Sequence, residues 1–235
     1  MNLYIKDAVD FVRSRMDEMS FVPSEMVTGG EPDDRNLEET VERLLKEAII
    51  SVHTEAPASL MEGRKLTESA ALTVMIHSVN TDGVLTLDFT DALSTKAPDI
   101  LRLVSFKAGD SDTLVTSVAF EDEAVARLQN NRYMRGTPDC PVMVRMATSS
   151  EYKPVYKYYT TTLKRDKEDG GLVLNPPTFV MEYFPVPKYS ETDGYFISAM
   201  LEIATLTYLT ALVFQTYQQN ETAKVFFDRA ADALK

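Results

Sequence analysis

The sequence holds few residue patterns that could carry out chemistry, and the first of them is His53-Thr54-Glu55. A His-x-Glu pair supplies a zinc ligand and a general acid or base in zinc deaminases, which also require a Cys-x-x-Cys pair downstream. Cys140 is the single cysteine of the chain, so that second pair is missing. The pattern therefore does not predict a deaminase. We expect His53 to lie at the C-terminal end of a helix, where a cation is favourable.

Cys140 raises a second option, a hydrolase in which this thiol is the nucleophile and His53 or His77 is the base. No family signature surrounds Cys140, and a lone thiol is more often a small buried hydrophobe. The Thr28-Gly29-Gly30 stretch is not a phosphate-binding loop, because no Gly-Lys-Ser/Thr follows it. We therefore predict a protein that is not an enzyme and has no cofactor or metal site, with a hydrolase using Cys140 as an alternative.

One loop is less generic in its composition. Residues 130–138 place Arg132, Tyr133 and Arg135 before a Gly-Thr-Pro turn. Such a loop can be purely structural, a rigid turn with its arginines in solvent. Arg and Tyr are also enriched at the hot spots of protein interfaces. The functional interpretation is a docking loop that meets the acidic N-terminal helices of a neighbouring subunit.

The composition argues against several kinds of protein. The chain has 235 residues and a formal charge of −12, and the segment after Met1 lacks the pattern of a secretory signal. Tight binding of free nucleic acid relies on clustered Lys and Arg and is not expected. The charge is uneven, because residues 1–62 contain 14 acidic and 6 basic side chains, whereas residues 131–165 contain 2 acidic and 7 basic. One part of the molecule is thus expected to attract the opposite part of another copy.

The elements that position these residues are predicted from hydrophobic spacing. Apolar residues at helical spacing predict an amphipathic helix over 3–19 and a second one that Asn36 and Glu39 begin as a capping box and Pro57 ends. From about residue 68 the period becomes strand-like. Hairpins are expected over 72–87 and 101–118, then a short helix over 121–130. Further strands are expected over 141–147, 152–161, 172–174 and 178–183.

The C-terminal part returns to helical spacing over 194–219 and in a last amphipathic helix. The run 195–214 has one charge, Glu202, and is long enough to span a membrane. Its central carboxylate, its hydroxyl residues and the lack of flanking Lys or Arg favour a buried helix, so no membrane contact is predicted. Because its apolar residues surround the helix, some are expected to meet another subunit, with burial inside one chain as the alternative. The predicted subunit or portal interface consists of Arg132, Tyr133, Arg135, Leu206, Leu209, Phe214, Phe226 and Phe227.

These elements predict an α+β fold. Two helices precede the β-rich region and two follow it, and each amphipathic stripe must be buried against something. We expect residues 1–66 and 190–235 to form one helical bundle from the N- and C-terminal helix pairs. Residues 67–189 are then an inserted β-rich region.

Two stretches carry a resemblance to a known family. The run APDILRLVSFK at 97–107 and the run NRYMRGTP at 131–138 resemble head-to-tail adaptor (connector ring) proteins of short-tailed bacteriophages, particularly the ring proteins of crAss-like phages. The closing helices are similar to the C-terminal pair of that class. The residues that carry this similarity are Tyr208, Ala211, Gln215, Ala223, Phe227, Ala230 and Ala233.

The resemblance implies a structural virion protein of the tail or neck, synthesised in the cytoplasm of a bacterial host. Adaptors of this class form rings, here expected to have about twelve copies, beneath the portal protein and against other tail or ring proteins. Genomic DNA passes through the ring channel without sequence-specific binding, and an acidic wall would repel it. No cofactor is implied. The alternatives are another capsid- or tail-associated structural or assembly protein, and the Cys140 hydrolase.

Overall fold

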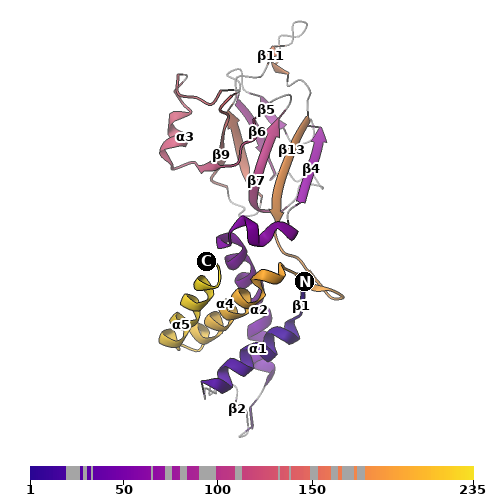
Figure 1. The fold of residues 1–235 in the computed structure, drawn as a ribbon, viewed down its shortest axis with the longest axis vertical. Helices are drawn as coiled ribbons and strands as arrows, with labels where there is room; N and C mark the ends of the chain where they lie inside the picture. The colour runs from indigo at the N-terminus through magenta and orange to yellow at the C-terminus, as the bar shows by residue number, and fades with distance from the viewer. Residues whose placement is uncertain are drawn as a thin grey trace. The chain divides into compact units, whose positions relative to one another are not determined.

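The computed structural model describes most of the chain. The residues described are 1–19, 27–28, 31–32, 34–64, 66–71, 76–79, 84–89, 99–108, 113–131, 133–137, 139–148, 153–159, 164–165, 172–173 and 178–235. Helices and several β-sheets are both present, so the fold is of the mixed α and β class (Figure 1). Two compact units form: unit 1 comprises Met1–Arg64 and Pro187–Lys235, and unit 2 comprises Lys65–Val186. The boundaries predicted from sequence were 66/67 and 189/190.

Unit 1 is built mainly from helices around one apolar core. Its helices are α1 (Ile5–Glu18), α2 (Asp34–Glu55), α4 (Glu202–Thr216) and α5 (Asn220–Asp232), with the short 3₁₀ helices η2 (Ala58–Arg64) and η4 (Ala199–Leu201). All four α-helices contribute to the same core, and α4 contacts the other three. Two small sheets complete the unit, formed by β1 (Asn2–Leu3), β15 (Gly194–Phe196) and β14 (Tyr189–Ser190), and by β2 (Val27–Thr28) and β3 (Glu31–Pro32).

The helix patterns explain this core. The buried residues of α1 recur at helical spacing, and they are Ala8, Val9, Val12 and Met16. In α4 the buried residues instead surround the axis: Ala204, Thr205, Leu206, Leu209, Thr210, Ala211, Leu212, Val213 and Phe214. A helix that is apolar on all sides is buried on several sides, and α4 is enclosed by its three neighbours within the chain.

Two details of the helices differ from the sequence prediction. Helix α2 begins at Asp34, so Asn36 lies inside it, and its carbonyl accepts a hydrogen bond from the Thr40 hydroxyl at 2.8 Å. The capping box at Asn36 is therefore wrong. A helix was expected over 194–219, but this segment begins as strand β15. Leu3 of β1 pairs with Tyr195 of β15, so the start of the segment is extended, and α4 begins only at Glu202.

The described residues of unit 2 form three sheets, of five, three and two strands, and one short helix. One sheet has the order β5 (Ile76–Val79), β6 (Val84–Asp88), β10 (Val155–Tyr159), β9 (Val142–Met146), β8 (Val118–Phe120). The second has the order β4 (Leu66–Ala71), β13 (Thr178–Pro185), β7 (Ile100–Ala108), and in the third β11 (Lys164–Arg165) pairs with β12 (Leu172–Val173). Strands β8 and β9 are parallel, whereas the other pairs are antiparallel.

The larger sheet of unit 2 is covered on both faces. On one face, β6, β9 and β10 pack on β7 and β13, with Phe106 and Tyr158 in edge-to-face contact at 5.2 Å between ring centroids. On the other face, Ala126 of α3 (Ala124–Leu128) packs on Val84, Val144 and Tyr159. This second face carries the surface described next.

The hairpin predictions in this region have mixed outcomes. Strands β5 and β6 form an antiparallel pair, as the hairpin predicted over 72–87 requires. Residues 72–75 and the turn at 80–83 lie outside the described residues. The hairpin predicted over 101–118 is found in part, as one antiparallel bridge, and its turn at 109–112 lies outside the described residues. Phe106 and Val115 exchange two backbone hydrogen bonds of 2.9 Å, while β7 pairs along its length with β13 and β8 pairs with β9.

Candidate interaction surface

Helix α3 and the loop that follows it are held on the sheet by the side chain of Gln129. This residue is 2% exposed. Its Nε2 donates to the Val125 carbonyl at 3.0 Å, and its Oε1 accepts from the buried N–H of Gly136 at 2.8 Å. One buried carboxamide thus joins the end of α3 to Gly136, seven residues further along the chain.

Arg135 and Gly136 complete this fixation. Arg135 is half-buried, its Nε donates to the Gln129 carbonyl at 3.0 Å, and its guanidinium lies 5.9 Å from the centroid of the Tyr159 ring. A Cβ added at Gly136 would lie 2.6 Å from the Tyr159 carbonyl oxygen and 2.8 Å from the Val142 nitrogen, so only glycine fits there. Burial raises the pKa of Tyr159, an effect that Arg135 opposes and Glu121 reinforces.

The fixed loop presents two apolar side chains to solvent. The Asn131 side chain accepts a hydrogen bond from the Tyr133 N–H at 3.0 Å, and the Asn131 carbonyl accepts one from the Met134 N–H at 3.0 Å. Tyr133 is 93% exposed and Met134 is 55% exposed. A tyrosine held out on a rigid turn loses little further conformational entropy when it binds a partner.

More exposed apolar side chains lie in the same short segment. Five exposed apolar side chains lie between residues 120 and 134. We call this set the α3 surface, and it consists of Phe120, Val125, Leu128, Tyr133 and Met134. A concentration of this kind, on an element fixed from beneath, is typical of a surface that binds another protein.

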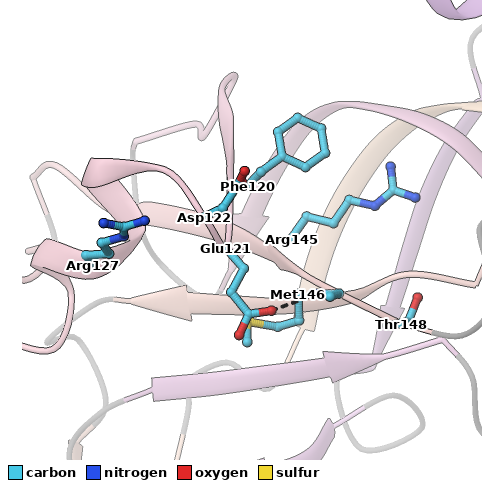
Figure 2. A pocket seen from close by; sticks show the side chains of 8 residues that line it. Phe120, Glu121, Asp122, Arg127, Arg145, Met146 and Thr148 are labelled. Carbon is cyan, nitrogen blue, oxygen red and sulfur yellow. Dashed lines mark hydrogen bonds between the residues drawn. The ribbon is translucent and has the colours of Figure 1, made fainter.

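A groove of about 730 Å³ lies beside this surface, where β8 turns into α3 (Figure 2). Glu121 is one of its lining residues, and its carboxylate accepts a hydrogen bond from the Ala147 N–H at 3.0 Å. Arg127 and Arg145 lie at opposite ends of the view in Figure 2. We call this cavity the edge groove, and its lining consists of Phe120, Glu121, Asp122, Arg127, Arg145, Met146, Ala147 and Thr148.

The structure separates the residues that the sequence assigned to an interface. Tyr133 is exposed, Arg135 is half-buried against Tyr159, and Arg132 lies outside the described residues. Phe227 is half-buried in contact with Tyr208, at 4.9 Å between ring centroids. The other four assigned side chains lie in the core of unit 1 with exposed fractions of 4% or less: Leu206, Leu209, Phe214 and Phe226.

An interface role does not fit those four core residues. Phe214 and Phe226 are stacked on one another at 5.5 Å between ring centroids, so their surface is already used inside the chain. The apolar residues that α4 and its preceding turn do expose are Ile203, at 59%, and Met200, at 70%. Sequence periodicity did not identify them, because a helix that is apolar on all sides does not reveal which side its neighbours leave open.

Sequence reasoning also missed Gln129 and Phe120. A glutamine at the end of a short helix is normally solvated, so nothing in its type predicts that it is buried. Phe120 lies in a strand-like run, whose alternation does not predict that its side chain is 53% exposed. The sequence did offer one signal for this surface: the apolar residues of the α3 surface lie close to three consecutive acidic residues at 121–123.

The residues considered for catalysis lie in separate surroundings. His53 is 1% exposed in unit 1, and its Nδ1–H donates to the Ile49 carbonyl at 2.8 Å. Cys140 is exposed in unit 2, where its backbone and that of Thr137 exchange two hydrogen bonds of 3.1 Å. Within the described part of the chain, no group of three or more His, Cys, Asp or Glu side chains could hold a metal ion. The side chain of His77 lies outside that part.

One described segment, Ala199–Thr216, is long and apolar enough to cross a membrane by length and composition, and 56% of it is buried within the structure. Core helices of globular proteins meet the same criterion.

Comparison with known proteins places the chain in no family. No protein-family model matches the sequence, and a search of curated proteins finds no match.

Proposed function

We propose that this protein is a structural subunit of a phage head-to-tail adaptor ring, which joins the capsid to the tail beneath the portal protein. The observation that carries the proposal is the α3 surface. It gathers exposed apolar side chains on an element that Gln129 and Arg135 hold rigid, and its tip is the 93% exposed Tyr133. The resemblance of residues 131–138 to adaptor proteins falls on this same loop.

The fold supports a subunit made of a bundle and an insertion. In this proposal α1, α2, α4 and α5 are the bundle formed by the N- and C-terminal helix pairs, and unit 2 is the β-rich insertion. Ring formation requires two different faces on each copy, so that the contact is heterologous and repeats around an axis. Two separately folded units provide such faces.

The charge distribution supports head-to-tail contact. Unit 1 contains 20 acidic and 11 basic side chains, an excess of nine negative charges, whereas unit 2 contains 16 and 13, an excess of three. Within unit 2, residues 131–165 contain 7 basic and 2 acidic side chains. We infer that this part of unit 2 faces unit 1 of the next copy and that assembly weakens with rising salt, because exposed charge pairs are screened. DNA in the channel would meet an acidic protein and slide without sequence-specific contacts.

The test is the mass of the purified protein alone and mixed with the portal protein of the same phage, by light scattering and negative-stain imaging. Rings of about twelve subunits, or assembly that requires the portal, support the proposal. Tyr133→Ala is expected to weaken assembly by roughly tenfold or more without altering the unfolding transition. Leu114→Ala is the matched control, because Leu114 is 52% exposed in unit 2 but outside the α3 surface.

A wild-type protein that stays monomeric with and without portal contradicts the adaptor role. Reversing Arg132 and Arg135 to Glu is a second possible variant of this loop. Because Arg135 packs on Tyr159 and bonds the Gln129 carbonyl, that reversal also disturbs the loop. Tyr133→Ala is therefore the sharper variant.

A further inference from the structure

The start of helix α4 is wound more tightly than the rest of it. Residues 199–201 form the 3₁₀ helix η4, and α4 begins only at Glu202. Leu201, at the junction, has φ −99° and ψ −1°, whereas α-helical residues have values of about −63° and −42°. A 3₁₀ helix rises about 2.0 Å per residue and an α-helix about 1.5 Å. The three residues of η4 are therefore longer, by roughly 1.5 Å, than the same residues in an α-helix.

Ser198 stands at the position of a helix cap, but its hydroxyl is bonded elsewhere. Its φ of −68° and ψ of 133° are typical of an N-cap residue. The side chain makes no cap hydrogen bond, and its Oγ instead donates to the Leu60 carbonyl at 2.6 Å. Leu60 belongs to η2, which ends at Arg64, and unit 2 begins at the next residue. One short hydrogen bond thus ties the start of η4 to the segment that leads into unit 2.

A buried hydroxyl near the start of α4 lacks the acceptor that an α-helix normally supplies. Thr205 is 0% exposed, and its Oγ1 has no hydrogen-bond partner among the described residues. The usual acceptor is the carbonyl four residues earlier, here that of Leu201, which a ψ of −1° turns out of line with the helix. Four other threonines of the helices do donate to the carbonyl four residues before them, at 2.8 to 3.0 Å: Thr40, Thr54, Thr210 and Thr216. An unpaired buried hydroxyl is unfavourable, and an α-helical Leu201 would relieve it.

We propose that Ser198 is a latch with two positions, which couples η2 to the start of α4. In the first position, which the structure shows, the Ser198 hydroxyl donates to the Leu60 carbonyl and η4 remains a 3₁₀ helix. In the second position η2 has moved away, and the same hydroxyl accepts a hydrogen bond from the Leu201 N–H as an N-cap. Helix α4 then begins at Ala199, and Thr205 gains the Leu201 carbonyl as its acceptor. This latch is independent of the proposed ring function.

The two positions exclude one another by distance. Conversion of residues 199–201 to α-helix shortens them by roughly 1.5 Å and changes their rotation by about 20° per residue. Ser198 is then drawn toward α4 and out of hydrogen-bond reach of Leu60. Met200, which is 70% exposed, turns with η4, whereas Ile203, which is 59% exposed, already lies in α4. A movement of the segment that leads into unit 2 therefore changes the apolar surface at the start of α4.

Two substitutions of Ser198 separate its two hydrogen bonds. Ser198→Ala removes both the bond to Leu60 and the cap. Ser198→Asp keeps a strong cap acceptor, but a carboxylate has no proton to donate to the Leu60 carbonyl. The matched control is Ser59→Asp, because Ser59 is an exposed residue of η2 beside Leu60 and receives the same charge.

The measurement is hydrogen exchange of single backbone amides in the full chain, by NMR, together with the ¹³Cα shifts of residues 199–201. Both Ser198 variants should speed exchange in η2 by roughly two- to tenfold, since one hydrogen bond is lost. At residues 201–203 the two variants should differ in sign, because Ser198→Ala speeds exchange whereas Ser198→Asp slows it and moves the ¹³Cα shifts toward α-helical values. Ser59→Asp should change neither region. A bond with only a structural role would speed exchange in both Ser198 variants.

Thr205→Val tests the second position without touching Ser198. Valine keeps the shape of the buried side chain and removes the hydroxyl, so only the second position loses a hydrogen bond. Exchange in η2 should therefore become slower by roughly two- to tenfold, and this variant keeps the test open if Ser198→Asp does not fold. Faster exchange at residues 201–203 in a folded Ser198→Asp, or exchange in η2 of Thr205→Val equal to that of the wild type, overturns the latch and leaves the ring function standing.

Discussion

Gln129→Ala is the perturbation that most directly tests how the α3 surface is built. The wild-type carboxamide is buried, and it bonds the Gly136 N–H at 2.8 Å and the Val125 carbonyl at 3.0 Å. The substitution removes both bonds at once. It leaves the backbone otherwise unchanged, since alanine is well accommodated beside a helix end.

The expected loss of unfolding free energy follows from the two hydrogen bonds that the Gln129 carboxamide makes, one through its oxygen and one through its nitrogen. The buried Gly136 N–H loses its acceptor, which costs about 1–3 kcal/mol. Val125 is exposed, so water can replace the donor to its carbonyl at little cost. Removing the buried methylene groups adds about 1 kcal/mol. Unit 2 should therefore lose about 2–4 kcal/mol, unless the loop opens locally and releases the unpaired N–H to water.

The assay combines urea unfolding with hydrogen exchange of the amides at 133–137. A lower unfolding free energy of unit 2, or faster exchange at Gly136 if the loop opens, is the expected result. Asn130→Ala, at the exposed neighbouring position, should change the unfolding free energy by less than about 0.5 kcal/mol. If Gln129→Ala loses less than about 1 kcal/mol and Gly136 stays protected, the carboxamide does not hold the loop, and the α3 surface is not fixed from beneath as described.

Three further predictions concern single positions in the two units. Gln218 has φ 59° at the end of α4, so Gln218→Gly should raise the unfolding free energy of unit 1 by about 1 kcal/mol, measured by thermal and urea unfolding. Gly194 has φ 65°, and an added Cβ would lie 2.5 Å from the Leu3 carbonyl oxygen, so Gly194→Ala should lower that energy by about 2 kcal/mol or more, and an unchanged transition would contradict the β1–β15 geometry. Burial raises the pKa of Tyr156 from 10.0 to about 12, partly opposed by Arg145, so the neutral ring contributes stability that is complete below pH 10 and is lost as the pH rises toward 12. The loss amounts to roughly 3 kcal/mol at full ionisation, and urea unfolding at pH 9 to 11.5 should show a smaller pH dependence for Tyr156→Phe than for the wild type.

The candidate surface shows where sequence reasoning reached its limit. The loop at 130–138 was singled out because Arg, Tyr, Gly and Pro stand together, and Tyr133 is indeed exposed at its tip. The supporting residue Gln129 was not found, since its burial arises only when Ala126 packs on the sheet and draws the end of α3 inward. Amino-acid type predicts what a residue can do, but burial decides whether its hydrogen bonds are structural.

Helix α4 illustrates the same limit in unit 1. Its apolar residues on all sides predicted burial on several sides, and the structure satisfies this demand with α1, α2 and α5 of the same chain. Leu206 and Leu209 therefore face the core, and the exposed apolar residues are Met200 and Ile203, near the start of the helix. Hydrophobic periodicity measures how much surface must be buried, but the neighbours available in space decide which residues remain outside.

The sequence by itself determined the alternation of helical and strand-like segments, and hence the mixed α and β class, because the 3.6- and 2-residue periods are local properties of the chain. It also determined the uneven charge and the unusual composition of the loop at 130–138. The tertiary structure alone decided that β8 joins β9 in parallel, that the Ala147 N–H beyond this pairing is bonded by the Glu121 carboxylate, and that Gln129 bonds the Gly136 N–H. These features depend on contacts between segments that only packing brings together, so no local pattern encodes them.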